Sequence, residues 1–216
     1  WDDASTGAIP IGFPFKYCGV TYTEIGMNCN GFIEFGSAAP TSSYSALSAG
    51  ASNRVAGMSQ DLYYNGPASP QTISRMTIGS APNRIFVIQW QNACRYSSST
   101  TGPINFQIRL HETSNMVEIV YGNTSSSSAT TYGYQVGILG ATSSDFNNRT
   151  TTSNWSSTTA GSTNSATCSR NSSITPPNGL TFRWTPPPVI TSTPTTLAFG
   201  SVTTGTNSSA QIISLN

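Results

Sequence analysis

Residues 104–122 read INFQIRLHETSNMVEIVYG and decide the fold. Apolar and polar residues alternate on both sides of the polar tip at 112–115, which is the pattern of two half-buried strands joined by a tight turn. Closing that turn predicts four cross-strand pairs: Phe106 with Tyr121, Ile108 with Ile119, Leu110 with Val117, and Arg109 with Glu118. Three apolar pairs then share one face and the charge pair takes the other, so the register follows from the sequence.

The composition excludes several classes of protein. Only 8% of the 216 residues are charged, and 9 basic against 8 acidic residues leave a net charge of +1. That balance predicts no nucleic-acid partner, and no apolar run approaches the roughly 20 residues of a membrane helix, so we expect no membrane insertion. An aromatic share of 10% argues against disorder. The chain has neither an initiator Met nor a signal segment, so we expect a processed or trimmed chain.

The rest of the chain reads as further strands between long Ser/Thr-rich loops. Arg84–Trp90 is the strongest apolar run and predicts a central strand, whereas the two prolines of Ala8–Tyr17 predict an edge strand or an extended lead-in. Val55–Tyr64 reads as one buried strand, and Ser143–Ser173 as a loop. The remaining predicted strands are Val20–Ile25, Gly31–Phe35, Thr72–Ile78, Gln135–Leu139 and Leu180–Trp184. No stretch has helical periodicity, so the fold class is all-β, a jelly-roll-like sandwich of two sheets.

A domain boundary is predicted at the triple proline 186–188, which separates a sandwich of residues 1–186 from a tail of residues 187–216. The tail contains two short apolar strand patterns but is too small to be stable alone. Its apolar residues are candidates for an assembly contact: Leu197, Phe199, Ile212, Ile213 and Leu215.

Four cysteines allow three disulfide pairings. Their spacing lacks the close pairs of a zinc site, so disulfides in an oxidising compartment are the prediction. Cys18 and Cys29 flank a short segment that reads as a stapled hairpin, which leaves Cys94 for Cys168.

The sequence offers no catalytic residue. His111 is the only histidine and falls on the polar side of the hairpin. Glu112 lies in the turn of the hairpin, and Glu118 belongs to its predicted charge pair with Arg109. No cofactor is expected. Asp2 and Asp3 are candidate calcium ligands, but no loop supplies the several oxygens that calcium takes.

Aromatic residues in predicted loops are candidates for stacking on sugars. Those singled out are Tyr63, Tyr64, Tyr96 and Trp155, with Tyr44, Tyr132 and Tyr134 as further loop tyrosines. Asn-X-Ser/Thr triplets mark surface positions at Asn123, Asn148, Asn154, Asn171 and Asn207.

Five segments in order carry a family resemblance: GAIPIGFPFKYCGVTYTEIGMNCNGFIEFGS, VAGMSQDLYYNG, SAPNRIFVIQWQNA, INFQIRLHETSNMVEIVYG and PPNGLTFRWTPP. Together they resemble a β-sandwich domain of large secreted surface proteins of Bacteroidetes-type bacteria, often exported by the type IX route. Relatives usually have an aromatic-Asp-Asp run where this chain has Gln60-Asp61, and one further strand before Trp1. The tail segment TLAFGSVTTGTNSSAQIISL resembles the opening strands of Hydin-like immunoglobulin repeats.

The resemblance implies an extracellular or cell-surface protein without catalytic residues. Two hypotheses follow: a structural or adhesive subunit, assembled into filaments by exchange of the tail strands between copies, and a carbohydrate-binding module that contacts surface glycans. The expected partners are accordingly copies of the chain or adjacent domains, or glycans. Alternatively, the tail is the stub of a following immunoglobulin-like repeat.

Overall fold

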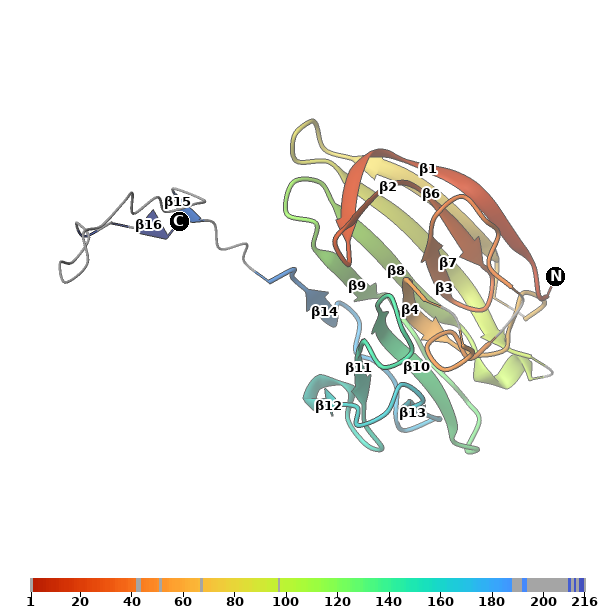
Figure 1. The fold of residues 1–216 in the computed structure, drawn as a ribbon. Coiled ribbons are helices and arrows are strands. Elements are labelled where there is room, and N and C mark those ends of the chain that lie inside the picture. The colour runs from red at the N-terminus through yellow and green to blue at the C-terminus, as the bar shows by residue number, and fades with distance from the viewer. Residues whose placement is uncertain are drawn as a thin grey trace. The chain divides into compact units, whose positions relative to one another are not determined.

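Antiparallel strands make up almost all regular structure of the chain in a computed structural model (Figure 1). The structure describes residues 2–41, 44–50, 52–66, 68–96 and 98–187, together with 192–193, 210, 212 and 214–215. Two units are distinguished, Trp1–Thr185 and Pro186–Asn216. The first is a two-sheet β-sandwich, as the sequence predicted.

The described residues of the sandwich form fourteen strands and two short 3-10 helices. The strands are β1 Ser5–Tyr17, β2 Val20–Asn28, β3 Phe32–Phe35, β4 Arg54–Ser59, β5 Leu62–Tyr63, β6 Thr72–Ile78, β7 Ile85–Arg95, β8 Ile104–His111, β9 Val117–Tyr121, β10 Tyr132–Leu139, β11 Phe146–Thr150, β12 Thr159–Ala160, β13 Cys168–Arg170 and β14 Thr181–Trp184. The 3-10 helices are η1 Ser99–Thr101 and η2 Trp155–Ser157. In the second unit, β15 Ser192–Thr193 pairs with β16 Ser214–Leu215.

The two sheets have different sizes and orders. One has eight strands in the order β1-β2-β3-β4-β10-β11-β12, with β13 also paired to β10. The other has six, in the order β14-β9-β8-β7-β5, with β6 also paired to β7. The strongest apolar run therefore lies inside a sheet as β7, and β1 is an edge strand, both as predicted.

The hairpin register predicted from 104–122 is confirmed. β8 and β9 pair Phe106 with Tyr121, Ile108 with Ile119, Leu110 with Val117 and Arg109 with Glu118. All six apolar side chains of these pairs are buried. The backbone N–H of His111 donates to the carbonyl of Met116 at 3.0 Å, which closes the turn that fixes the register.

The core lies between the two sheets and is reinforced by hydrogen bonds that cross it. The Tyr121 hydroxyl donates to the carbonyl of Gly57 on β4 at 2.8 Å, and Trp90 Nε1 donates to the carbonyl of Asn28 at 3.3 Å. A side chain at position 57 would collide with the ring of Phe106 on the opposite sheet. Gly57 therefore lets β4 approach β8 closely.

The segment 55–64 is not one strand. It forms β4 in the eight-stranded sheet and β5 in the six-stranded sheet, with Gln60 and Asp61 between them. Asn30 stabilises the crossing because its Oδ1 accepts the backbone N–H of Leu62 at 2.8 Å. Apolar periodicity could not reveal this break, because both halves are buried.

The segment 143–173 is not a loop, contrary to the prediction. It contains β11, η2, β12 and β13, and the side chains of Trp155, Cys168 and Arg170 are almost fully buried. Trp155 Nε1 donates to the carbonyl of Ser169 at 2.9 Å. Polar groups of buried side chains in this segment form hydrogen bonds to the backbone. The alternation of apolar and polar residues in the sequence does not predict such bonds.

The predicted disulfides are absent, and all four cysteines are free thiols. Cys18 and Cys29 stand at the two ends of β2, so nine extended residues separate them by roughly 30 Å. A disulfide needs its Cα atoms within about 7 Å, so the stapled-hairpin prediction is wrong for a geometric reason.

Cys94 and Cys168 are likewise unpaired, and they lie on different sheets, on β7 and β13. The thiols donate to the carbonyls of Tyr63 and Arg149, each at 3.5 Å. Burial raises the pKa of Cys168 to about 12, so its thiol is protonated at neutral pH.

Candidate functional site

The outer face of the six-stranded sheet carries a hydrogen-bonded polar surface. Since side chains alternate across a strand, the buried core residues of β7, β8 and β9 force their neighbours onto this face. The polar side chains on this face include those of Gln89 and Gln91 on β7, Gln107, Arg109 and His111 on β8, and Glu118 on β9. Arg183 on β14 stands opposite Glu118 on the same face.

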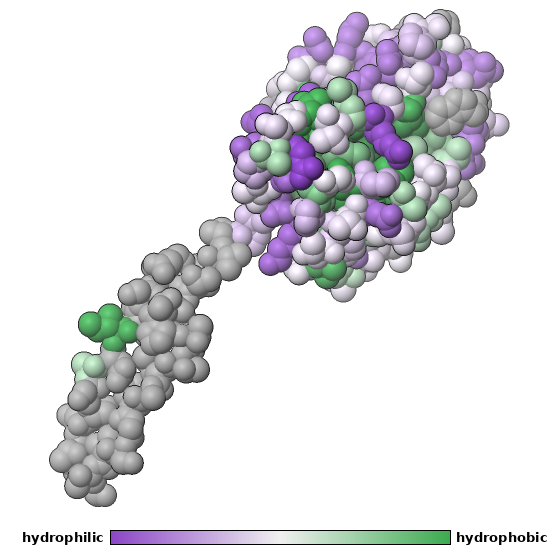
Figure 2. All heavy atoms as spheres, turned by 90° about the horizontal axis from the view of Figure 1, so that it is seen from above, coloured by the Kyte–Doolittle hydropathy of each residue, from purple (hydrophilic) through white to green (hydrophobic). Residues whose placement is uncertain are grey.

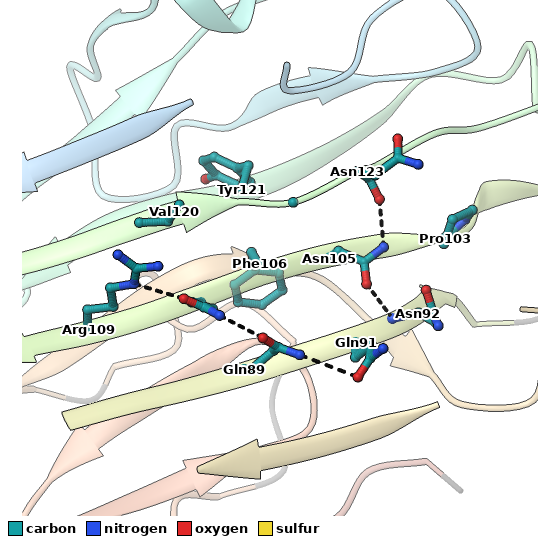
Figure 3. Close-up of a pocket in the computed structure, with 12 residues that line it drawn as sticks. Gln89, Gln91, Asn92, Pro103, Asn105, Phe106, Arg109, Val120, Tyr121 and Asn123 are labelled. Atoms are coloured by element: carbon teal, nitrogen blue, oxygen red, sulfur yellow. Dashed lines mark hydrogen bonds between the residues drawn. The ribbon is translucent and has the colours of Figure 1, made fainter. Parts of the chain in front are cut away.

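The amide side chains form a directed hydrogen-bond ladder across strands β8, β7 and β6. Arg109 Nε donates to Gln107 Oε1 at 2.8 Å, and Gln107 Nε2 donates to Gln89 Oε1 at 2.6 Å. Gln89 Nε2 then donates to Gln91 Oε1 at 3.3 Å, which also accepts the hydroxyl of Thr72. Figure 3 shows this chain of bonds between Arg109 and Gln91. Each bond orients the next amide, so the ladder is ordered before any ligand arrives.

At its other end the ladder joins a group of charges around Glu118. Arg183 Nε lies 2.7 Å from Glu118 Oε1, and Arg109 Nη1 lies 3.3 Å from Glu118 Oε2. His111 Nε2 is 3.6 Å from the same Oε2. Only 5% of the Glu118 side chain is exposed, so the carboxylate is held beneath the two arginines rather than offered to solvent.

A hollow of about 390 Å³ lies along the ladder. Its lining is rich in amides and also contains apolar residues: Gln89, Gln91, Asn92, Pro103, Asn105, Phe106, Gln107, Arg109, Val120, Tyr121, Gly122 and Asn123. Asn105 orders one end, because its Nδ2 donates to the carbonyl of Asn123 at 2.6 Å and its Oδ1 accepts the N–H of Asn92 at 2.9 Å (Figure 3). The hollow is a candidate ligand site.

The face of the molecule that Figure 2 shows is mixed in character. Apolar residues stand there in small groups among polar ones. The large exposed apolar residues of the sandwich lie on several elements: Val20, Tyr44, Met76, Ile78 and Tyr96.

A second cluster is acidic. The carboxylates of Asp2, Asp3 and Asp61 lie within 4.8 Å of one another, and Asn30 Nδ2 donates to Asp3 Oδ1 at 2.9 Å. Burial, together with the charges of Asp2 and Asp3, raises the pKa of Asp61 above its usual value. The structure thus adds Asp61 to the two candidate calcium ligands, and calcium binding stays a prediction.

The aromatic candidates for glycan contact differ in their exposure to solvent. Tyr63 and Tyr96 lie together edge to face, with ring centroids 5.8 Å apart, and Tyr96 is exposed. Tyr64 and Trp155 are buried, so neither ring can stack on a sugar. The hydroxyl of Tyr64 donates to the carbonyl of Cys29 in the core. A sequence pattern cannot distinguish such a buried tyrosine from an exposed one at the edge of the sandwich.

The other loop tyrosines also differ in their surroundings. Tyr44 is exposed, Tyr134 is fully buried, and Tyr132 lies under the guanidinium of Arg95 at 4.3 Å.

The tail candidates are largely outside the described residues. Nothing is described of Leu197, Phe199 and Ile213. Ile212 is exposed, and Leu215 lies on β16 opposite Ser192.

The glutamines of the ladder were not among the predicted site residues. The signal that could have found them is the recurrence of glutamine at every second position on paired strands, at 89 and 91 and at 107.

A family model described as NIDO related matches residues 1–186. The chain belongs to the NIDO-related family. Membership makes residues 1–186 an extracellular domain of the adhesive type. No curated protein and no solved structure is significantly similar to the chain. The described residues include no helix with the length and apolar character of a membrane span.

Proposed function

We propose that residues 1–186 of this NIDO-related chain act as a non-enzymatic adhesive module that binds carbohydrate through the outer face of the six-stranded sheet. The observation that supports this is the hollow of about 390 Å³ with its ordered amide ladder. Amides both donate and accept hydrogen bonds, as sugar hydroxyls do, and a pre-ordered site loses little conformational entropy on binding.

A binding role suits the charged groups better than a catalytic one. His111, the only histidine of the sequence, lies next to Glu118, and Glu118 is held by two arginines. With only 5% of its side chain exposed, that carboxylate is poorly accessible to a substrate, which suits neither a general acid nor a nucleophile.

A glycan array tests the proposal. The wild-type sandwich should bind at least one class of glycan, and Gln107→Ala should weaken that binding because it breaks the ladder at its centre. Ser74→Ala, an exposed change on β6 of the same sheet, is the matched control and should bind as the wild type does. If no glycan binds, or if both variants behave alike, carbohydrate binding at this face is excluded.

A second candidate is a filament subunit assembled by exchange of the tail strands between copies. It is favoured by Ile212, which is 83% exposed in the tail, and by β1, a thirteen-residue edge strand. An edge strand offers unpaired backbone groups to an added strand, although Pro10 and Pro14 each remove a donor from β1.

Deleting residues 189–216 tests the assembly hypothesis by light scattering. The wild-type chain should form particles larger than a monomer, and the deletion variant should remain monomeric. A filament that persists without the tail excludes donor strands, and a wild-type chain that stays monomeric at high concentration excludes the assembly itself. Either result leaves carbohydrate binding untouched.

A further inference from the structure

The charges of the residues in and around the hollow indicate which class of carbohydrate it could bind. Among the described residues that line it, Arg109 is the only charged one. The neighbouring charges do not cancel it fully, because Arg109 and Arg183 share the single carboxylate of Glu118. Arg183 is the closer partner, at 2.7 Å against 3.3 Å. The site therefore has a surplus of positive charge.

The free hydrogen-bonding groups at the two ends of the ladder are both donors. Arg109 has five N–H donors, of which one goes to Gln107 and one to Glu118 among the described residues. At the far end, Gln91 Oε1 accepts from both Gln89 and Thr72, whereas its Nε2 has no partner in the described part of the chain. Both ends of the ladder thus present N–H donors.

The hollow also lacks an accessible aromatic platform. Its two rings, Phe106 and Tyr121, are each 1% exposed, and the Tyr121 hydroxyl is bonded to the carbonyl of Gly57. Stacking, the usual means of holding an uncharged sugar ring, is therefore not available here. Affinity must come from hydrogen bonds and charge, which favours a ligand with anionic oxygens.

We propose that the hollow binds an acidic polysaccharide whose uronic-acid carboxylate pairs with Arg109, while Gln91 donates to a sugar unit further along the same polysaccharide. The inference rests on the proposed carbohydrate function and names its ligand class. A planar guanidinium matches the two oxygens of a carboxylate. The strand rise and spacing put Arg109 and Gln91 on the order of 14 Å apart, which suits a chain of several linked sugars.

Binding of polygalacturonate and of an uncharged galactan, measured by titration calorimetry on the purified chain, tests this proposal. Polygalacturonate should bind more tightly than galactan, and its affinity should fall as salt is raised because the contact is an ion pair at a partly exposed site. Arg109→Gln should weaken polygalacturonate binding by about tenfold, the factor expected for one charge-assisted hydrogen bond. Arg109→Lys should retain more affinity than Arg109→Gln, because it keeps the charge.

Arg75→Gln is the matched control, since it removes an exposed arginine of β6 on the same sheet that does not line the hollow. It should leave binding unchanged. Equal loss in Arg75→Gln and Arg109→Gln, or no loss in Arg109→Gln, overturns the assignment of Arg109. Binding of galactan in preference to polygalacturonate overturns the acidic ligand and leaves the carbohydrate function standing. If neither polymer and no array glycan binds, both proposals fail together.

Discussion

The β8–β9 hairpin and the segment 143–173 are both packed parts of one sandwich, but they are stabilised differently. The hairpin buries apolar side chains at every second position, and its pairs follow from local spacing. The segment buries Trp155 and Arg170, whose polar atoms donate to backbone carbonyls. Regular alternation is visible in a sequence, whereas burial through long-range hydrogen bonds to the backbone is not.

The first prediction concerns Trp155 and carries the largest expected effect. Trp155→Ala should lower the free energy of unfolding by about 3–5 kcal/mol, the usual cost of removing a buried large aromatic side chain. The ring packs edge to face against Tyr121 at 5.3 Å, so its loss reaches the hairpin as well. Denaturant unfolding followed by tyrosine and tryptophan fluorescence measures this. A cost below about 1 kcal/mol would mean that 143–173 is a dispensable loop after all.

Ile108→Ala tests the other side of the comparison and should cost about 2–5 kcal/mol. Ile108 is fully buried and stands opposite Ile119 in the centre of the hairpin. The same unfolding experiment applies, and Ile78→Ala on the exposed end of β6 is the control, with little expected change. Similar values for the two variants would contradict the register.

The turn of the hairpin provides a pH-dependent prediction. Arg84 bonds to both carboxylate oxygens of Glu112, at 2.8 and 2.6 Å, and lowers the pKa of Glu112 to about 2. A carboxyl whose pKa is lower in the folded state stabilises the protein above its unfolded value, near 4.5, and loses that contribution as the pH falls toward 2.

Glu112→Gln should therefore reduce the thermal unfolding temperature at pH 7, and the difference from the wild type should shrink between pH 4.5 and pH 2. Thermal scans across this range provide the check. A difference that is the same at all pH values would show that the ion pair is not its source.

The smallest effect is expected for Arg109. Arg109→Ala should cost less than about 1 kcal/mol, because the pair is partly exposed and Arg183 keeps Glu118 neutralised. If Arg109→Ala proves more damaging than Ile108→Ala in denaturant unfolding, the hairpin depends on its outer face rather than on its core.

The sequence by itself determined the all-β class, the hairpin register and the position of β7 inside a sheet. These features depend on period-two alternation and turn residues, which act over a few positions. The charge pair of Arg109 and Glu118 followed from the same register.

Only the tertiary structure decided the rest, because the deciding contacts join residues far apart in the chain. The break between β4 and β5, the separation of Cys18 from Cys29 by the length of β2, and the burial of Trp155 all depend on which sheet a strand enters. The amide ladder arises in the same way, since Gln89 and Gln107 become neighbours only when β7 pairs with β8. Local patterning fixes which face a side chain takes, and the sheet topology decides what it meets there.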